Sequence, residues 1–214
     1  MSRITVIDYG MGNLLSVCRA FEHLGAEVEL TADPEAVRRA ERLVLPGVGA
    51  FGDGMAALND LGLSSAIREA AVGGTPVLGI CLGAQMLLDG SEEFGEHQGL
   101  GLIPGRVRAI PASGSQGEPL KVPHMGWADL HAANDTCFDH PLLAGTVRGS
   151  AVYFVHSFQA HPLAEADRAA ECDYAGNRLT AMISHGKVFG CQFHPEKSGP
   201  VGLQILKNFV ELAA

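Results

Sequence analysis

The sequence predicts an α/β fold built on a doubly wound, mostly parallel sheet flanked by helices, with a smaller antiparallel portion in the C-terminal half. Short apolar runs alternate with helical patterns through the first 80 residues, an order typical of parallel strands joined by helices. Strand-like runs then follow one another with no helix between them, which favours antiparallel pairing. With 214 residues, 47% of them hydrophobic, one domain over residues 1–214 is expected.

The parallel half is predicted from four strands, at residues 4–7, 28–30, 42–45 and 77–80. A Gly-rich turn over residues 10–13 leads into a helix that ends at Gly25, where glycine offers a stop. Asp33 and Pro34 fit the N-cap and first turn of a short helix. Further helical segments are expected between residues 53 and 71, and another helix after Cys81.

The second half is predicted to contain more loop. Residues 99–129 are rich in Gly and Pro, and residues 112–117 indicate an exposed loop. Later strands are expected at residues 152–155, 169–172, 179–183 and 188–193. The last element is predicted to be an amphipathic helix that starts at residues 198–200.

Charge and cysteine content exclude several classes of protein. A formal net charge of −9 without a basic stripe argues against nucleic-acid binding. The five cysteines, at positions 18, 81, 137, 172 and 191, form no CxxC pair, so neither a disulfide framework nor a zinc site is expected. Asp8 interrupts the N-terminal apolar run, where a signal peptide would need continuous apolar residues. No apolar run elsewhere approaches the ~20 residues that a membrane-spanning helix needs. We expect a cytoplasmic protein with no metal, cofactor or membrane partner.

Cys81 stands in a pattern that places a nucleophile on a sharp turn. An apolar strand runs into Gly79-Ile80-Cys81-Leu82-Gly83, and a helix is expected next. This is the thiol analogue of the Gly-x-Ser-x-Gly elbow, where glycines permit a strained turn. A helix N-terminus favours the thiolate, and the N–H of Leu82 would face a developing oxyanion. The alternative is a small buried filler, which is the usual state of an intracellular cysteine.

His194 and Glu196 are the candidates for the base and the group that orients it. His194 follows an apolar strand whose carboxyl end should lie on the same edge of the sheet as Cys81. In an extended chain held by Pro195, the Glu196 side chain would face the same side as the imidazole. An ordinary surface His and Glu is the alternative. His156 also ends a strand, but lacks an acid two residues on, and is expected in the substrate pocket.

A nucleotide-binding interpretation of Gly10-Met11-Gly12 is disfavoured. Leu15 occupies the position of the third glycine of the dinucleotide fingerprint, and no acidic residue ends the second strand.

Three segments together resemble the class I glutamine amidotransferases: residues 45–51 (LPGVGAF), 79–85 (GICLGAQ) and 192–198 (QFHPEKS). More narrowly, residues 8–14 (DYGMGNL), 123–127 (PHMGW) and 153–157 (YFVHS) resemble the glutaminase subunits of imidazole glycerol phosphate synthase. The resemblance covers essentially the whole chain. It implies a flavodoxin-like amidotransferase fold and hydrolysis of glutamine through a thioester on Cys81.

The resemblance also implies roles for residues around the triad. Backbone donors at Val48 and Leu82 would form the oxyanion hole, and the glycines beside Val48 would let that peptide flip when the partner signals. The implied substrate contacts are Gly49, Gln85, Glu93 and Ser157. Gln85 could instead be an exposed helix residue, and Glu93 part of an acidic loop.

A partner is implied as well. The resembling enzymes form a heterodimer with a (βα)8-barrel cyclase that uses the ammonia in histidine biosynthesis. Residues expected at the docking face or gate are Met11, Asn13, Met125, Trp127, Tyr153 and Lys197. Met125 to Trp127 are expected in an exposed turn, although a core position for Trp127 is an alternative. The family usually has Asn where this chain has Ala128, which puts a polar interface contact in doubt.

Three other functions remain open on the sequence. One is a glutaminase of another synthase, such as the pyridoxal phosphate synthase subunit, which lacks the residue 123–127 segment. The second is a catalytically silent regulatory protein on the same fold, against which the complete triad argues. The third is a cysteine peptidase, which would not need the partner-facing segments.

Overall fold

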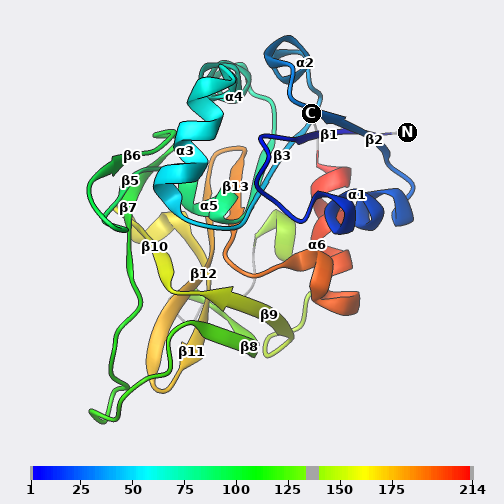
Figure 1. The fold of residues 1–214 in the computed structure, drawn as a ribbon. Helices are drawn as coiled ribbons and strands as arrows, with labels where there is room; N and C mark the ends of the chain where they lie inside the picture. Colours follow the sequence, from blue (N-terminus) through cyan, green and yellow to red (C-terminus); the bar gives the residue numbers. More distant parts are fainter. Residues whose placement is uncertain (1, 134–139, 213–214) are drawn as a thin grey trace.

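The computed structural model describes residues 2–133 and 140–212, so Cys137 lies outside the described residues. A nine-stranded sheet with the strand order β2-β1-β3-β4-β13-β12-β11-β8-β9 organises the fold (Figure 1). Its first five strands are mutually parallel and the remaining pairs are antiparallel. The predicted α/β sheet with an antiparallel portion in the C-terminal half is confirmed.

The parallel strands are β1 (Arg3–Ile7), β2 (Glu27–Thr31), β3 (Leu43–Gly47), β4 (Val77–Cys81) and β13 (Val188–Cys191). The strands of the antiparallel part are β8 (His124–Ala132), β9 (Ala151–His156), β11 (Arg168–Tyr174) and β12 (Asn177–His185). A second sheet has the order β10-β7-β5-β6. Its strands are β5 (Leu88–Ser91), β6 (His97–Gln98), β7 (Ile103–Ala109) and β10 (Phe158–Pro162).

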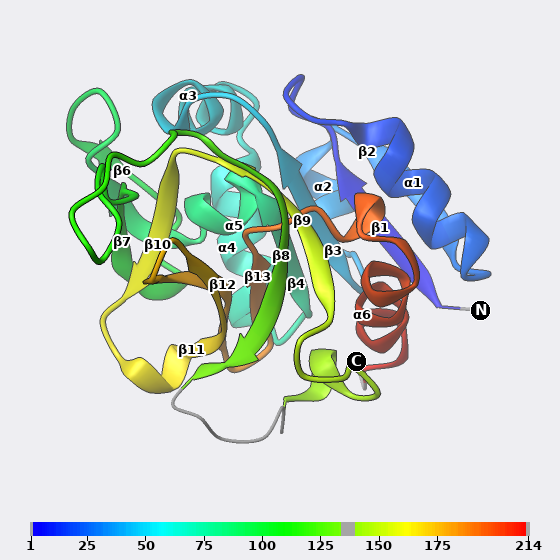
Figure 2. The same ribbon diagram turned by 90° about the horizontal axis from the view of Figure 1, so that it is seen from below.

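Helices cover both faces of the parallel strands, as seen from below in Figure 2. One face carries α1 (Leu14–His23) and α6 (Gly199–Glu211), and the other carries α2 (Pro34–Arg38), α3 (Phe51–Asp60), α4 (Leu63–Val72) and α5 (Leu82–Met86). Side chains alternate between the two faces of a strand, and in β3 this sends Val44 to the α1 and α6 side, while Leu43 and Leu45 face the other. Two apolar clusters therefore hold the sheet between helix layers.

The sequence underestimated the strand content of the middle of the chain. Within residues 99–129 the structure has β7 and the first part of β8, although residues 112–117 are a loop exposed at all positions except Gly114. The helix after Cys81 is also shorter than its apolar run suggested, since it ends at Met86 and β5 begins at Leu88. Both errors concern the pairing of β5 with β7. β5 has no regular alternation of apolar residues, and the alternation in β7, where Ile103, Gly105 and Val107 are buried, is obscured by Pro104 and Gly105.

Two expectations about element boundaries are confirmed. α2 begins at Pro34 with Asp33 as its N-cap, whose carboxylate accepts the N–H of Glu35. α6 begins at Gly199. In the described part of the chain, no helix is long and apolar enough to span a membrane.

Candidate active site

Cys81 lies on a strained turn between β4 and α5. Its backbone has φ 54° and ψ −111°, in the left-handed half of backbone space that non-glycine residues rarely adopt. A Cβ at Gly79 would lie 2.6 Å from the backbone nitrogen of Ala84, and one at Gly83 would overlap the carbonyl oxygen of Leu45. Glycine is therefore required on both sides of Cys81, because strand and helix backbones meet at this turn. The predicted elbow is confirmed as a backbone conformation.

His194 and Glu196 form a buried pair next to Cys81. Nδ1 of His194 lies 2.8 Å from Oε1 of Glu196, and the side chains are 3% and 0% exposed. The contact arises differently from the prediction, which had an extended chain at this point. Residues 195–197 form one 3₁₀ turn with His194 as its N-cap, because the fixed φ of Pro195 suits the first helical position.

Ser198 fixes the backbone of His194 against β9. Its hydroxyl donates to the carbonyl of His194 (2.6 Å) and accepts the N–H of Tyr153 (3.0 Å). The N–H of His194 in turn donates to the carbonyl of Tyr153 (2.9 Å). Three hydrogen bonds thus set the position of the imidazole on the strand edge, and Ser198 is a positioning residue that the sequence pattern had placed only at a helix start.

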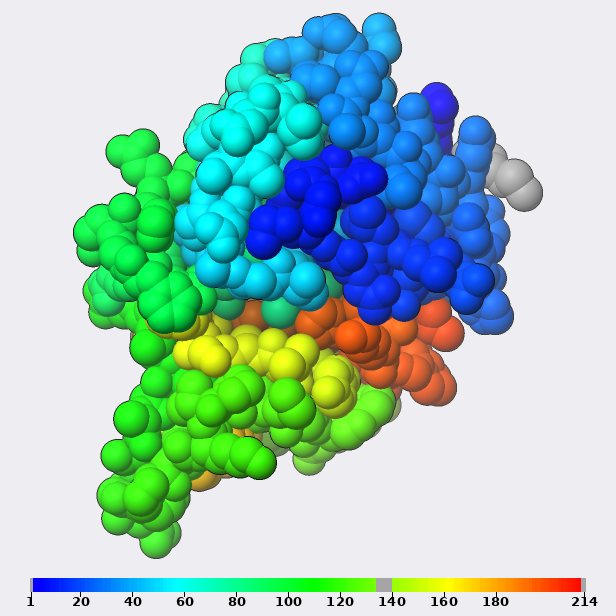
Figure 3. Space-filling view, viewed as in Figure 1, coloured from blue at the N-terminus to red at the C-terminus, as the bar shows by residue number. Residues whose placement is uncertain are grey.

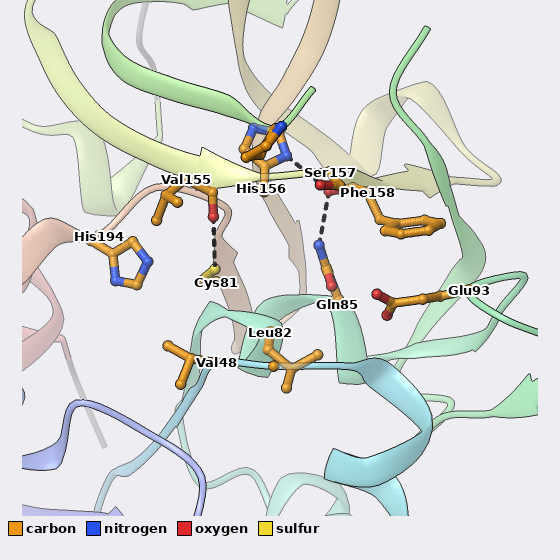
Figure 4. Close-up of a pocket in the computed structure, with 12 residues that line it drawn as sticks. Val48, Cys81, Leu82, Gln85, Glu93, Val155, His156, Ser157, Phe158 and His194 are labelled. Atoms are coloured by element: carbon orange, nitrogen blue, oxygen red, sulfur yellow. Dashed lines mark hydrogen bonds between the residues drawn. The ribbon is translucent and has the colours of Figure 1, made fainter. Parts of the chain in front are cut away.

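The imidazole of His194 is set up to carry a positive charge. Burial alone lowers its pKa, but the neighbouring Cys81 and Glu196 stabilise the imidazolium and together raise the pKa to about 9. Its Nε2 makes no hydrogen bond to the described residues and the ring is turned toward the sulfur of Cys81 (Figure 4). At neutral pH the site therefore favours a protonated His194 facing the cysteine.

A pocket of about 380 Å³ opens above Cys81. It lies where the N-terminal segment (blue to cyan in Figure 3) meets the β9 and β10 segment (yellow) and the C-terminal segment (orange). The side chains that line it are shown in Figure 4. The lining residues are Val48, Gly49, Cys81, Leu82, Gln85, Glu93, Pro123, Val155, His156, Ser157, Phe158 and His194.

All predicted oxyanion and substrate residues line this pocket, as does His156. Gln85 is 5% exposed, so it is not the exposed helix residue of the alternative interpretation. Its Nε2 donates to the carbonyl of Phe158 (2.9 Å) and to Oε1 of Gln192 (3.0 Å), which leaves its oxygen for a ligand. The carboxylate of Glu93 accepts the N–H of Phe51 (2.7 Å) and is held at the pocket wall rather than on a free loop.

The loop of residues 47–49 packs tightly against its neighbours. A Cβ at Gly47 would clash with the Tyr9 hydroxyl and would lie 3.0 Å from Cβ of Leu82. Gly49 has φ +103°, and a Cβ there would lie 2.8 Å from the terminal methyl of Met11. Glycine is needed at both positions, and Met11 touches the loop directly. Asn13 and Val48 border a second small cavity together with His194.

The other predicted docking residues lie around β8 and β9. Met125 and Trp127 are 63% and 58% exposed, which rules out a core position for Trp127. They lie within β8, not in a turn, because residues 124–129 pair with β9 throughout. Trp127 packs edge-on against Tyr153, with 6.0 Å between ring centroids. Lys197 is exposed, in the turn after His194.

Ala128 belongs to the opposite side of β8. Side chains alternate along a strand, and Ala128 packs against the apolar cluster that contains Phe154 and Leu130. Ala128, where the family usually has Asn, therefore does not belong to the face of β8 that presents Trp127.

His156 in the pocket wall is paired with a second buried histidine, His124, which does not line the pocket and was missed in the sequence. His156 Nδ1 lies 2.8 Å from the carbonyl oxygen of Phe158, and its Nε2 lies 3.3 Å from Nδ1 of His124. His124 is stacked on the rings of Phe154 and Tyr174. A carbonyl only accepts, so Nδ1 of His156 carries the hydrogen and Nε2 accepts from His124. The strand position of His124 was hidden by the Gly and Pro content around it.

Acid should destabilise the protein through His156. Burial, with smaller contributions from His124 and His194, lowers the pKa of His156 to about 4, against about 6.5 in an unfolded chain. Between these pH values the unfolded state binds more protons, so stability falls as pH drops. We expect a loss of about 3 kcal/mol by pH 4. The His156→Gln variant should lose correspondingly less in urea titrations at pH 7 and pH 4; parallel pH dependence in both proteins would contradict this.

Gln192 is a further residue that the sequence did not single out. It is 3% exposed, and its Nε2 lies 3.8 Å from the sulfur of Cys81. Among the described residues, no group of three or more His, Cys, Asp or Glu side chains is arranged to hold a metal ion.

Comparisons with known proteins agree with this geometry. The sequence model of the class-I glutamine amidotransferase family matches residues 5–213. Imidazole glycerol phosphate synthase subunit HisH 1 of Legionella pneumophila is 48% identical over 99% of this chain and 100% of its own length. Subunit HisH of Geobacillus kaustophilus is 50% identical over 98% of this chain and 97% of its own length.

Solved structures show the same fold at lower sequence identity. A structure of PurLQS from Thermotoga maritima superimposes with a TM-score of 0.73 over 98% of both chains, at 23% identity. The relatives match this chain from end to end, and the motifs around Cys81, His194 and Glu196 lie within the matched residues. The chain therefore belongs to the class-I glutamine amidotransferase family and, within it, to the HisH subunits of imidazole glycerol phosphate synthase.

Proposed function

We propose that this chain is the glutaminase subunit of imidazole glycerol phosphate synthase, and that it hydrolyses glutamine and passes the ammonia to a cyclase subunit in histidine biosynthesis. One observation carries the catalytic part: Cys81 lies on a left-handed turn at the floor of a pocket, facing a His194 imidazole that is paired with Glu196 at 2.8 Å. A nucleophile, a proton carrier and an orienting carboxylate are the parts that acyl transfer requires.

In the first half-reaction, the thiolate of Cys81 attacks the side-chain amide carbon of glutamine. The carbonyl oxygen becomes an oxyanion, for which the backbone N–H groups of Val48 and Leu82 are the proposed donors. The imidazolium of His194 gives its proton to the departing nitrogen, so ammonia leaves and a glutamyl thioester remains. The raised pKa of His194 keeps that proton available at neutral pH.

In the second half-reaction, the neutral imidazole of His194 takes a proton from water. The resulting hydroxide attacks the thioester carbon and the C–S bond breaks, which restores the thiolate and leaves His194 as the imidazolium. Glutamate leaves, and its new carboxyl group loses its proton to solvent. Glu196 holds Nδ1 throughout, which directs Nε2 at the reacting atoms.

Glutamine recognition is proposed to use Gly49, Gln85, Glu93 and Ser157. The carboxylate of Glu93 suits the α-ammonium group of the substrate, because it lies at the pocket wall and carries the opposite charge. The free side-chain oxygen of Gln85 can accept a second substrate N–H. The backbone of Gly49 and the Ser157 hydroxyl would complete the contacts.

The partner is proposed to be a cyclase with a (βα)8 barrel, joined as a heterodimer. Trp127 and Met125 form an exposed apolar patch on β8, next to the strand that carries His156 into the pocket. Met11 touches the Gly49 loop, so a partner that moves Met11 would act on the proposed oxyanion hole. Tyr153, Lys197 and Asn13 would extend this docking face. Ammonia released at a covered face would pass directly to the cyclase and would not enter the surrounding solvent.

Trp127→Ala should weaken binding of the cyclase about 30-fold or more, because a large exposed aromatic at the centre of an interface is a typical hot spot. Isothermal titration of the cyclase into each variant measures this. Leu163→Ala is the matched control: Leu163 is also strongly exposed, but lies on the β10 side of the molecule. Equal affinity of both variants would argue against this docking face.

The direct test is release of glutamate from glutamine by the isolated chain, by the chain with the cyclase, and by the complex with the cyclase substrate. We expect little turnover alone and a large increase in the loaded complex, since the residue 47–49 loop has the glycines needed to rearrange. Identical rates in all three conditions would contradict a gated oxyanion hole. Activation by the partner of another synthase, or no turnover in any condition, would favour the alternative functions.

A further inference from the structure

A chain of buried amides connects the pocket wall to the sulfur of Cys81. Gln85 Nε2 donates to the carbonyl of Phe158 (2.9 Å) and to Oε1 of Gln192 (3.0 Å). The Nε2 of Gln192 then donates to the sulfur of Cys81 at 3.8 Å, within the range of N–H···S contacts. Both glutamines are buried, at 5% and 3% exposure, which limits the competition of water for these bonds.

The direction of every bond in this chain is fixed by one backbone group. The carbonyl of Phe158 can only accept, so the Gln85 atom that faces it must be the amino nitrogen. The second hydrogen of that nitrogen then requires an oxygen on Gln192. The opposite end of the Gln192 amide, which faces Cys81, must consequently be its N–H₂ group.

The groups around the sulfur distinguish its two protonation states. The carbonyl of Val155 lies 3.9 Å from the sulfur and can interact only with a neutral S–H, because two acceptors gain nothing from each other. The amide of Gln192 is a donor, and a donor stabilises the anionic sulfur more than the neutral one. A thiolate therefore has two stabilising neighbours, the imidazolium of His194 and the Gln192 amide.

We propose that Gln192 is a positioning residue for the Cys81 nucleophile: its amide donates to the thiolate and holds the sulfur toward the pocket, in an orientation that Gln85 and the Phe158 carbonyl impose. Gln85 then has two functions, because the group that orients Gln192 also lines the glutamine site. This inference rests on the proposed role of Cys81 as the nucleophile. It adds a hydrogen-bond donor, the Gln192 amide, which lies outside the triad and contacts the thiolate.

The test is alkylation of Cys81 by iodoacetamide without glutamine, followed at the Cys81 peptide by mass spectrometry over a range of pH. Only the thiolate reacts. In Gln192→Met, which keeps the length of the side chain and removes the donor, the rate at pH 7 should fall about fivefold, the factor for one hydrogen bond. The midpoint of the pH–rate profile should move to higher pH.

Two further variants separate this role from packing. Gln192→Glu preserves the shape but faces the sulfur with an acceptor, so it should also react more slowly than the wild type. Gln85→Met should produce the same shift as Gln192→Met, and the double variant should show no additional loss, because both act through one hydrogen bond.

Gln159→Met is the matched control. Gln159 is as buried as Gln192, but its side chain binds the backbone N–H of Thr180, away from the sulfur, and its alkylation profile should match that of the wild type. A wild-type profile in both Gln192 variants, or an equal shift in the control, would overturn the proposal. Glutamine turnover that survives Cys81→Ala would instead overturn the proposed function, so the two failures are distinguishable.

Discussion

Cys81→Ala should lower glutamine hydrolysis by the activated complex at least 10⁴-fold, because a covalent mechanism has no route without its nucleophile. The assay is glutamate release in the presence of the cyclase and its substrate. The cyclase reaction supplied with ammonium salts should continue, since it requires only the product of the glutaminase. Loss of glutamine hydrolysis with retention of the ammonia-dependent cyclase reaction would show that the variant lacks the nucleophile but still leaves the cyclase active.

Cys172→Ala is the control for this substitution. Cys172 is also buried, on β11, and does not line the pocket. We expect near wild-type turnover and a modest loss of stability. Turnover by the Cys81→Ala complex at a rate close to that of the control would exclude the thioester mechanism.

Local signals were sufficient to predict the turn at Cys81. Glycine at positions 79 and 83 is required by backbone contacts within a few residues of the turn and with the adjacent strand, and such requirements leave a short pattern in the sequence. The same holds for Asp33 and Pro34 at the start of α2. The parallel half of the sheet was predictable because each strand and the helix after it form one local unit.

Tertiary pairing explains what the sequence did not reveal. β5 and β7 become strands because they pair with each other and with β6 and β10; β5 has no local alternation of apolar residues, and in β7 the alternation is obscured by Pro104 and Gly105. Likewise, Gln192 reaches Cys81 from 111 positions along the chain, so its role depends on β13 lying beside β4. The Glu196 contact was expected for the wrong local geometry, since the 3₁₀ turn is dictated by Pro195 and by the bonds of Ser198.

The roles assigned to the pocket residues stay predictions until they are measured, as does the single domain over residues 1–214. The placement of these residues around one pocket supports the roles without testing them. After the Cys81→Ala substitution, substitution of Glu196 is the most direct test of the proposed triad.

Glu196→Gln should lower kcat about a hundredfold to a thousandfold, because an amide cannot hold the imidazolium that forms during catalysis. The variant keeps the size of the side chain, so the fold should persist. Glu92→Gln, which changes an exposed acid on the β5–β6 loop, is the control and should retain activity. Equal rates for the two variants would remove Glu196 from the mechanism.

The pH dependence of kcat in Glu196→Gln shows more clearly than the rate alone whether Glu196 acts on the pKa of His194. The pKa of His194 is about 9 because Cys81 and Glu196 together overcome the effect of burial. If the protonated imidazole is the acid that releases ammonia, wild-type kcat should fall as pH rises through about 9. In Glu196→Gln the carboxylate charge is lost, so the pKa of His194 must decrease, and the alkaline limb should move to lower pH. A purely structural role for Glu196 would lower the rate and leave that limb in place, so a displaced limb identifies Glu196 as the group that sets the proton affinity of His194.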